Sequence, residues 1–384
     1  MQGNKWDIFC RVVDNFGDIG VCWRLARQLA TEHGLKVRLW TDDLANLGKL
    51  CPAIDPNLAT QTQQGVTVQH WTTPFTFNND VADVVIETFA CELPDTYIAA
   101  MTKCTRPSPP VWINLEYLSA EDWIAGCHGL VSPHPRLPLH KYFFFPGFVP
   151  QSGGLLREAR LMAQHQAWQA DAAASRTYFG LPPAVSGSEE ILVSLFCYDN
   201  PALPSLLKSW AGGSVLLRCL VPAGLALQQA AASLGQAALH PGEQLRQGNL
   251  ILHALPFSSQ EDYDRLLSLC TINFVRGEDS FVRAQWAAHP LVWQIYPQDA
   301  DAHQIKLAAF LDLYCGGLSP SAASACRAFW QAWNSTSTSA AAVVWPAFCD
   351  TLPELSPHAA AWAGHLSEQP DLAGQLVGFC QNLL

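Results

Sequence analysis

The sequence predicts an α/β protein made of two tandem units, each a parallel, doubly wound sheet, with a cleft between the two sheets. Three observations lead to this fold class. Short apolar runs typical of buried strands alternate with helix-like segments, and parallel neighbours need such crossover connections. A glycine-rich break at residues 148–154 interrupts this alternation, which then restarts. The length of 384 residues also exceeds the usual size of a single core.

The first unit is expected over residues 1–150. Its first strand, 7–13 (DIFCRVV), is followed by the helix pattern GVCWRLARQLATEHG, whose apolar residues recur on one face and which Gly34 ends. The further strands read KVRLWTD, VTVQHW, ADVVIETFA, PVWINLEYL and YFFFPGF in chain order.

The second unit is expected over residues 155–361. Its strand candidates are EEILVSLFCY, GSVLLRCLVP, GNLILHALPF, CTINFV and LVWQIY, separated by helix candidates. A last apolar helix, about 362–384, is expected to pack back across the first domain. Ligands of such sheets bind beyond the carboxyl ends of the strands, so the residues just after each strand are the first candidates for function.

Composition excludes several classes of protein. Hydrophobic residues make up 49% and charged residues 14%, as in a well-cored protein, and the net charge of −11 argues against nucleic-acid binding, which needs a basic face. No segment has the roughly 18–20 uninterrupted apolar residues of a membrane span, and the first residues do not read as a secretory signal. The 13 cysteines are scattered without CxxC pairs, and the 12 histidines lack metal-ligand spacing. We expect a cytoplasmic protein with reduced core cysteines and no metal, whose acidity suits a locally cationic partner.

The stretch VVDNFGDIGVCWRLA, residues 12–26, runs from the first strand through a short loop into the helix, so this loop is expected at the sheet edge where ligands bind. It holds Asp14, Asn15, Gly17 and Asp18. Two interpretations stay open: Asp18 caps the helix while Asn15 and Gly17 make a turn, or the carboxylates face a substrate. The loop lacks the GxGxxG fingerprint, which weakens the case for an NAD-linked oxidoreductase.

The polar turn RGEDS at residues 276–280 is the second candidate. It lies between a predicted strand and a predicted helix, and the first N–H groups of a helix favour an anion. Arg276 adds a fork of donors, so the turn would suit a diphosphate without a metal. The alternative is structural: Asp279 or Ser280 caps the helix while Arg276 pairs with Glu278 on the surface.

Aromatic residues follow other strands of the second unit. Phe196 and Tyr198 lie in SLFCYDN, and Phe257 with Gln260 lies in ALPFSSQEDYDRLL. Aromatic faces at this edge would sandwich a planar base while Gln260 reads its edge, but aromatics at strand ends are more often core filler. Both interpretations stay open.

Four stretches resemble the EarP-type protein-arginine rhamnosyltransferases of bacteria, the neisserial type included: WDIFCRVVDNFGDIGVCWRLARQL, VWINLEYLSAEDW, FFFPGF and RGEDSFVRAQWAAHPLVWQIYPQ. The similarity covers essentially the whole chain, and the four stretches are highly specific when taken together. This resemblance implies a GT-B glycosyltransferase with two Rossmann-like lobes that face each other across a cleft, the first on the acceptor side and the second on the nucleotide-sugar side.

The resemblance also implies a reaction. A metal-independent, inverting enzyme would move L-rhamnose from dTDP-β-L-rhamnose to one arginine side chain of translation elongation factor P, activating the factor, with no cofactor besides this donor substrate. The family's essential carboxylates fall on Asp14, Asp18 and Glu278. Its donor-site residues fall on Asn15, Phe16, Gly17, Phe196, Tyr198, Phe257, Gln260, Arg276, Gly277, Glu278, Asp279 and Ser280, with Phe196 and Phe257 around the thymine.

The residues fit this chemistry, because arginine stays cationic and is a poor nucleophile that carboxylates can hold and orient. Our hypothesis is that Asp18 accepts a proton late, that Asp14 helps to hold the guanidinium, and that Glu278 positions the sugar or shares the proton transfer. Two alternatives are a two-lobe transferase with another nucleotide sugar and a small acceptor, and a non-catalytic protein that binds a translation factor.

Overall fold

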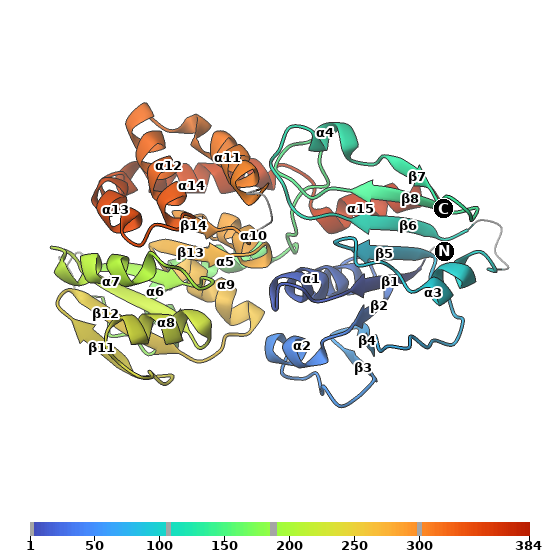
Figure 1. Cartoon of the computed structure of the whole chain (residues 1–384), viewed down its shortest axis with the longest axis horizontal. Helices are drawn as coiled ribbons and strands as arrows, with labels where there is room; N and C mark the ends of the chain where they lie inside the picture. Colours follow the sequence, from blue (N-terminus) through green and yellow to red (C-terminus); the bar gives the residue numbers. More distant parts are fainter. Residues whose placement is uncertain (1–3, 105–108, 185–189, 298–301) are drawn as a thin grey trace. The chain divides into compact units, whose positions relative to one another are not determined.

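The computed structural model describes residues 4–104, 109–184, 190–297 and 302–384, which form two compact units (Figure 1). Unit 1 runs to Ala159 and takes up the chain again at residues 367–384, and unit 2 comprises Arg160–Leu366. Each unit contains one sheet with helices on both faces (Figure 1). Among the described residues, no helix combines the length and the apolar character needed to cross a membrane.

The sheet of unit 1 has eight strands within the described residues, in the order β3-β4-β2-β1-β5-β6-β8-β7. Neighbours from β4 to β8 are parallel, and β3 and β7 pair antiparallel at the two edges. The strands are β1 Lys5–Cys10, β2 Lys36–Thr41, β3 Thr60–Gln63, β4 Val66–His70, β5 Val84–Thr88, β6 Val111–Leu115, β7 Val131–Pro133 and β8 His140–Phe144. The helices are α1 Gly17–Thr31, α2 Leu44–Leu50, α3 Asp95–Met101, α4 Ile124–Cys127 and α15 Leu372–Gln381.

Two apolar cores cover the faces of this sheet. On one face, the buried stripe of α1, which includes Ile19, Leu25 and Leu29, packs on side chains of the central strands. On the other face, aromatic residues gather around Phe9, whose ring lies 4.8 Å from that of Tyr97 on α3. The strands β1, β5 and β6 are buried, and in a sheet of this kind ligands bind at the loops beyond the carboxyl ends of the strands.

The sheet of unit 2 has six strands within the described residues, in the order β11-β12-β10-β9-β13-β14, all parallel except β11. The strands are β9 Glu190–Leu195, β10 Leu216–Pro222, β11 Gln244–Gln247, β12 Leu250–Leu255, β13 Ile272–Arg276 and β14 Leu291–Gln294. The helices are α5 Leu161–Ala170, α6 Ala172–Tyr178, α7 Leu203–Gly212, α8 Leu225–Ser233, α9 Gln260–Leu269, α10 Asp279–Ala287, α11 Ala302–Tyr314, α12 Pro320–Trp333, α13 Ala340–Asp350 and α14 Leu352–Ser367. Glu189, the first residue of one predicted strand, lies outside the described residues.

Unit 1 extends past the predicted domain boundary at residue 150. The segment to Ala159 stays with it because Leu155 and Leu156 are buried there and the carbonyl of Arg157 accepts a hydrogen bond from Gln28 on α1, at 2.9 Å.

The predicted single helix over residues 362–384 is two helices. Asp371 begins the second, α15, because its side chain accepts the N–H of Gly374 at 3.1 Å, and Pro370 precedes this cap. Helix α15 packs on the sheet of unit 1 through Leu372, Leu376 and other apolar residues, and Figure 1 shows it behind β6 and β8.

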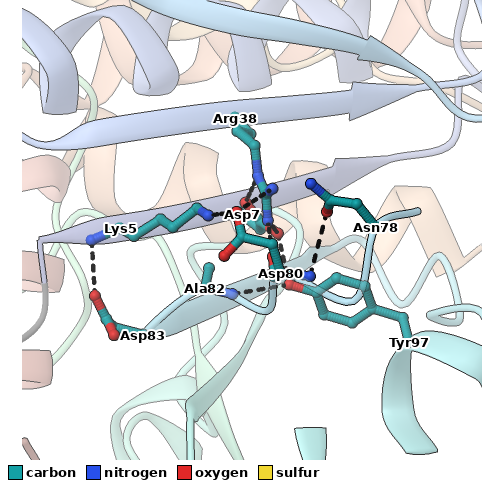
Figure 2. Close-up of polar contacts among 8 residues, drawn as sticks. All are labelled: Lys5, Asp7, Arg38, Asn78, Asp80, Ala82, Asp83 and Tyr97. Carbon is teal, nitrogen blue, oxygen red and sulfur yellow. Dashed lines mark hydrogen bonds and ion pairs between the residues drawn. The ribbon is translucent and has the colours of Figure 1, made fainter. Parts of the chain in front are cut away.

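A buried ion pair joins β1 to β2 (Figure 2). Asp7 is fully buried, and its two carboxylate oxygens each accept a hydrogen bond from Arg38 at 2.6 Å. The Tyr97 hydroxyl donates to the same carboxylate at 2.5 Å, while Asp80 contacts Arg38 and Lys5 from the outer side (Figure 2). Burial by itself lowers the pKa of Arg38, but the Asp7 carboxylate outweighs burial, so the pKa is raised.

Asp7→Ala is expected to lower the free energy of unfolding by about 3–5 kcal/mol, because Arg38 would stay largely buried without its counter-charge. Asp80→Ala removes a carboxylate whose side chain is 48% exposed, and it should cost about 1 kcal/mol or less. Urea denaturation followed by circular dichroism measures both changes. Equal losses in the two variants would contradict the assignment of the buried pair as the stabilising contact.

Candidate active site

The loop between β1 and α1 makes a tight turn at the carboxyl edge of unit 1. The N–H of Gly17 donates to the carbonyl of Asp14 at 2.6 Å, and Asn15 adopts a positive φ of 28°. A Cβ on residue 17 would lie 2.5 Å from Asp14 Oδ2, so any larger residue there would require the Asp14 side chain to move. The turn brings Asp14 directly beside the first turn of α1.

Asp18 is buried, with 3% of its surface exposed, and its side chain points back to the loop rather than capping α1. One oxygen, Oδ2, accepts the N–H groups of Val13 and Asp14 at 2.8 and 2.9 Å. Within the described residues, the other oxygen, Oδ1, forms no hydrogen bond. The capping alternative for Asp18 is therefore wrong: one oxygen shapes the loop, and that Asp18 faces a substrate stays a prediction.

Burial raises the pKa of Asp18 above its usual value. The two backbone N–H groups act in the opposite direction, and the charges of Asp14 and Asp42 add to the increase. A carboxylate whose charged form is disfavoured in this way accepts a proton more readily than an ordinary aspartate. Asp18 thus has the properties of a proton acceptor.

In unit 2, the turn after β13 is held by contacts from its neighbours. Gly277, with a φ of 58°, reverses the chain, and its carbonyl accepts the indole N–H of Trp293 at 2.7 Å. The Ser280 hydroxyl contacts the backbone of Arg276, accepting its N–H at 3.0 Å and donating to its carbonyl. The side chain of Glu278, the N-cap residue of α10, accepts no capping hydrogen bond. The first N–H groups of α10 therefore have no side-chain cap from this residue.

The guanidinium of Arg276 lies against two aromatic rings. Its central carbon is 4.5 Å from the ring centroid of Phe196 and 4.4 Å from that of Tyr198, and the residue is 9% exposed. Within the described part of the chain, this guanidinium forms no ion pair and donates no hydrogen bond. The alternative of a surface pair with Glu278 is therefore wrong.

The other buried arginines in the described part of the chain each have a carboxylate partner. The ion-pair distances are 3.7 Å or less for the pairs Arg24–Glu158, Arg176–Glu190, Arg218–Glu190 and Arg283–Asp264. Among the buried arginines of the described residues, Arg276 differs from these four because only aromatic faces contact its charge. A buried cation without a counter-charge is costly, so this position favours an anionic ligand.

The remaining predicted donor residues lie at neighbouring strand ends of unit 2. Gln260 begins α9, is 5% exposed, and its Nε2 contacts Asp279 Oδ2 at 3.3 Å, which links α9 to the turn at Arg276. Phe257 is 37% exposed and lines a cavity of about 270 Å³ at the end of β12. The faces of Phe196 and Tyr198 that contact Arg276 are not available to a base.

The structure thus brings Phe196, Tyr198 and Gln260 to the turn at residues 276–280, all within unit 2. The other predicted residues belong to unit 1: Asp14, Asn15, Phe16, Gly17 and Asp18. Phe16 of that loop lies under the ammonium of Lys49, 5.5 Å from the ring centroid.

Two residues of the strand LVWQIY, Trp293 and Gln294, support the site although the sequence pattern did not predict it. Gln294, which is 7% exposed, accepts the backbone N–H of Tyr198 at 2.9 Å and so holds one ring beside Arg276. Trp293 stacks on Phe281 with centroids 3.9 Å apart while it binds the Gly277 carbonyl. A glutamine inside an otherwise apolar strand is the signal that would have indicated Gln294.

No group of three or more His, Cys, Asp or Glu residues suited to a metal ion occurs in the described ranges. All thirteen cysteines are free thiols, and Cys10, Cys22, Cys197 and Cys270 are buried in the apolar cores, as the sequence predicts.

Two doubly wound sheets, with an acidic loop at the edge of one and a turn beside a buried arginine at the edge of the other, form the fold of a GT-B glycosyltransferase. The fold is shared with solved structures of such enzymes at low sequence identity. Residues 6–381 match the family described as elongation factor P (EF-P) rhamnosyltransferase EarP, and the chain belongs to this family.

Relatives and a solved structure agree with this assignment. A protein-arginine rhamnosyltransferase of Pseudomonas putida is 50% identical over 381 residues, which cover 99% of each chain. A protein-arginine rhamnosyltransferase of Neisseria meningitidis is 36% identical over 386 residues, which cover 97% of this chain and 96% of the relative. A structure solved to explain EarP-mediated arginine glycosylation of translation elongation factor EF-P is 36% identical, covers 99% of both chains and has a TM-score of 0.69. The predicted fold class and the prediction of a glycosyltransferase are confirmed.

Asp18→Asn is expected to fold as well as the wild type, because an amide oxygen can accept the same two N–H groups. The pKa of Asp18 is higher in the folded protein than in the unfolded chain, and this difference sets the pH dependence. The protonated carboxyl contributes its full stability below the pKa of the unfolded state. This contribution is lost as the pH rises through the pKa of the folded state. The variant, which carries no charge, should therefore gain stability relative to the wild type above that pH.

Asp18→Ala removes the acceptor of both N–H groups and should lower the free energy of unfolding by about 1–3 kcal/mol. Denaturant unfolding of the wild type and the two variants tests these expectations. The measurements cover the range from pH 5 to about pH 8, in which folded proteins are generally most stable. A loss in Asp18→Asn as large as that in Asp18→Ala would show that the carboxylate charge, not its acceptor oxygen, holds the loop.

Proposed function

We propose that this chain transfers L-rhamnose from dTDP-β-L-rhamnose to an arginine side chain of translation elongation factor P, with inversion at the anomeric carbon, and so activates the factor in the cytoplasm. The names of the relatives and the matching EarP structure support the acceptor and the sugar. The observation that carries the donor assignment is the buried guanidinium of Arg276, which lies against two rings and has no counter-charge in the described residues.

The donor diphosphate would bind at the turn after β13. Arg276 supplies donors in a planar fork, and the first N–H groups of α10 supply further donors and the positive end of the helix dipole. Phe196 and Tyr198 hold the guanidinium from its faces, which leaves its edges for phosphate oxygens. Glu278, one residue before α10, would position the sugar.

The acceptor guanidinium would bind to the carboxylates of the opening loop. An arginine side chain is always charged near neutral pH, and its delocalised lone pairs make it a weak nucleophile. Asp14 and the free oxygen of Asp18 would accept hydrogen bonds from it and orient one nitrogen toward the sugar. The net charge of −11 favours the approach of a cationic segment.

In the transfer step, the guanidinium nitrogen forms a bond to the anomeric carbon while the bond from that carbon to the diphosphate oxygen breaks. The electron pair of the broken bond leaves with dTDP, whose growing negative charge Arg276 and the start of α10 stabilise. The proton of the attacking nitrogen passes to Asp18 as the new bond forms, and the raised pKa of Asp18 suits it to this task.

Mass spectrometry of elongation factor P after incubation with the enzyme and dTDP-β-L-rhamnose tests the function. We expect the factor to gain one deoxyhexose on an arginine, with activity retained in EDTA. Asp18→Asn should reduce turnover by about a hundredfold or more, because an amide cannot accept the proton. An unmodified factor with the wild-type enzyme would refute the proposed function, and near-normal turnover of Asp18→Asn would refute the role of Asp18.

Donor binding tests the assignment of Arg276. Arg276→Ala should weaken dTDP-rhamnose binding by about tenfold or more in calorimetry, because charged hydrogen bonds to the diphosphate are lost. The matched control is Arg246→Ala, which removes an exposed arginine on β11 and should leave affinity unchanged. Unaltered donor affinity in Arg276→Ala would contradict the diphosphate site, and tighter binding of UDP- or GDP-sugars would indicate a different donor.

A further inference from the structure

A carboxylate that follows the neighbouring strand β2 holds the opening loop of unit 1 at a second point. The Oδ1 atom of Asp42, the residue after β2, accepts the N–H of Val12 at 2.9 Å. The next two residues, Val13 and Asp14, donate their N–H groups to Asp18. Three successive backbone donors of the loop are therefore bound by two aspartate side chains.

This contact begins where the pairing of the two strands ends. The parallel register of β1 with β2 ends at Cys10 and Thr41. Asp42 lies one residue beyond that end on β2, and Val12 lies two residues beyond it on β1. The Asp42 side chain thus accepts an N–H where a backbone carbonyl of β2 would accept it if the sheet continued. The loop can leave the sheet here and still stay attached to it.

The backbone of Asp42 is fixed on both sides. Thr41 before it is fully buried, and the Thr41 carbonyl accepts the N–H of Trp71 at 2.7 Å. Asp43 after it caps α2, because its Oδ1 accepts the N–H of Asn46 at 2.9 Å. The Asp42 side chain itself is exposed, and within the described residues its Oδ2 atom forms no hydrogen bond. A side chain on a backbone held in this way is suited to position a neighbouring segment.

The exposed position of Asp42 decides what its hydrogen bond can do. Such a bond adds little to the stability of the fold, because water replaces it when it is lost. A catalytic group that moves by about 1 Å, by contrast, can lose about a hundredfold in turnover. The contact between Asp42 and Val12 therefore matters more for the position of the loop than for folding.

Asp42 also acts on Asp18 through its charge. Burial is the largest cause that raises the pKa of Asp18, and the charges of Asp14 and Asp42 add to the increase. Asparagine at position 42 would lose this charge but keep an acceptor oxygen for the N–H of Val12. The variant Asp42→Asn therefore separates the effect of the charge from that of the hydrogen bond.

We propose that Asp42 is a positioning residue for the transfer reaction: by holding Val12, it fixes the segment whose N–H groups bind Asp18. The inference rests on the proposed function, because it assumes that Asp18 accepts the proton of the attacking nitrogen. It goes beyond that function by assigning a role to a residue outside the opening loop, which the pairing of β1 with β2 brings beside it.

Turnover of elongation factor P at saturating dTDP-β-L-rhamnose, followed by mass spectrometry of the factor, tests this role. Asp42→Ala should lower kcat by about tenfold or more, because the loop loses its attachment to β2. Asp42→Asn should keep kcat within about threefold of the wild type, because its amide oxygen still accepts the N–H of Val12. The matched control is Asp55→Ala, which should leave kcat unchanged. Asp55 is also an exposed carboxylate of unit 1, and it accepts the N–H of Asn57 at 2.9 Å.

Two measurements that need no transfer separate positioning from folding. Amide hydrogen exchange of the peptide that contains residue 12 should be about tenfold faster in Asp42→Ala and unchanged in Asp42→Asn. Calorimetry with dTDP, which we assign to unit 2, should give the wild-type affinity for both variants.

The outcomes separate the two proposals. Normal kcat or normal exchange in Asp42→Ala would overturn the role of Asp42 and leave the proposed function intact. Equal losses of kcat in the two variants would show that the charge acts and not the hydrogen bond, and a loss of dTDP affinity in Asp42→Ala would show that the fold has changed. Either result overturns the positioning role. If the wild-type enzyme leaves the factor unmodified, the proposed function and the inference that rests on it both fall.

Discussion

The contact between the Arg276 guanidinium and the rings of Phe196 and Tyr198 is the interaction on which the donor site depends. Aromatic faces attract a cation and compensate part of its lost hydration, but they carry no net charge. The guanidinium therefore remains a positive charge in a largely buried position, and its edges stay available as donors. This state is unfavourable by itself, and the diphosphate that we propose to bind there would supply the missing counter-charge.

The surrounding structure keeps that arginine in place without neutralising it. Gln294 holds the backbone at Tyr198, Trp293 holds the carbonyl of Gly277, and Ser280 binds the backbone of Arg276 itself. None of these groups is a carboxylate. By contrast, Arg283 on α10, seven residues further along the chain, is paired with Asp264 at 2.7 Å and stabilises the fold.

Asp18 in the acidic loop is likewise held in place by backbone contacts that do not neutralise its charge. Its Oδ2 accepts two backbone N–H groups, which stabilise the turn, while burial and neighbouring carboxylates disfavour its charged form. A single carboxylate thus holds the loop with one oxygen, and the other is the oxygen that we assign to the acceptor. Asp18 in unit 1 and Arg276 in unit 2 thus both have partners that fix their position. These partners leave one carboxylate oxygen of Asp18 and the guanidinium edges of Arg276 without a hydrogen bond in the described residues.

The sequence by itself determined the alternation of strands and helices, because apolar periodicity and turn residues are local properties. It located Asp18 in the loop after the first strand, and it predicted Arg276 in the turn after a later strand, whereas Arg276 is the last residue of β13. It could not decide between capping and function for either residue, since that choice depends on contacts. Only the tertiary structure decided that Phe196 and Tyr198 lie against Arg276, which is some 80 positions further along the chain, and that residues 367–384 return to the first sheet. These outcomes depend on strand order and on packing between distant segments, and a pattern along the chain carries no information about which distant partner a buried charge will meet.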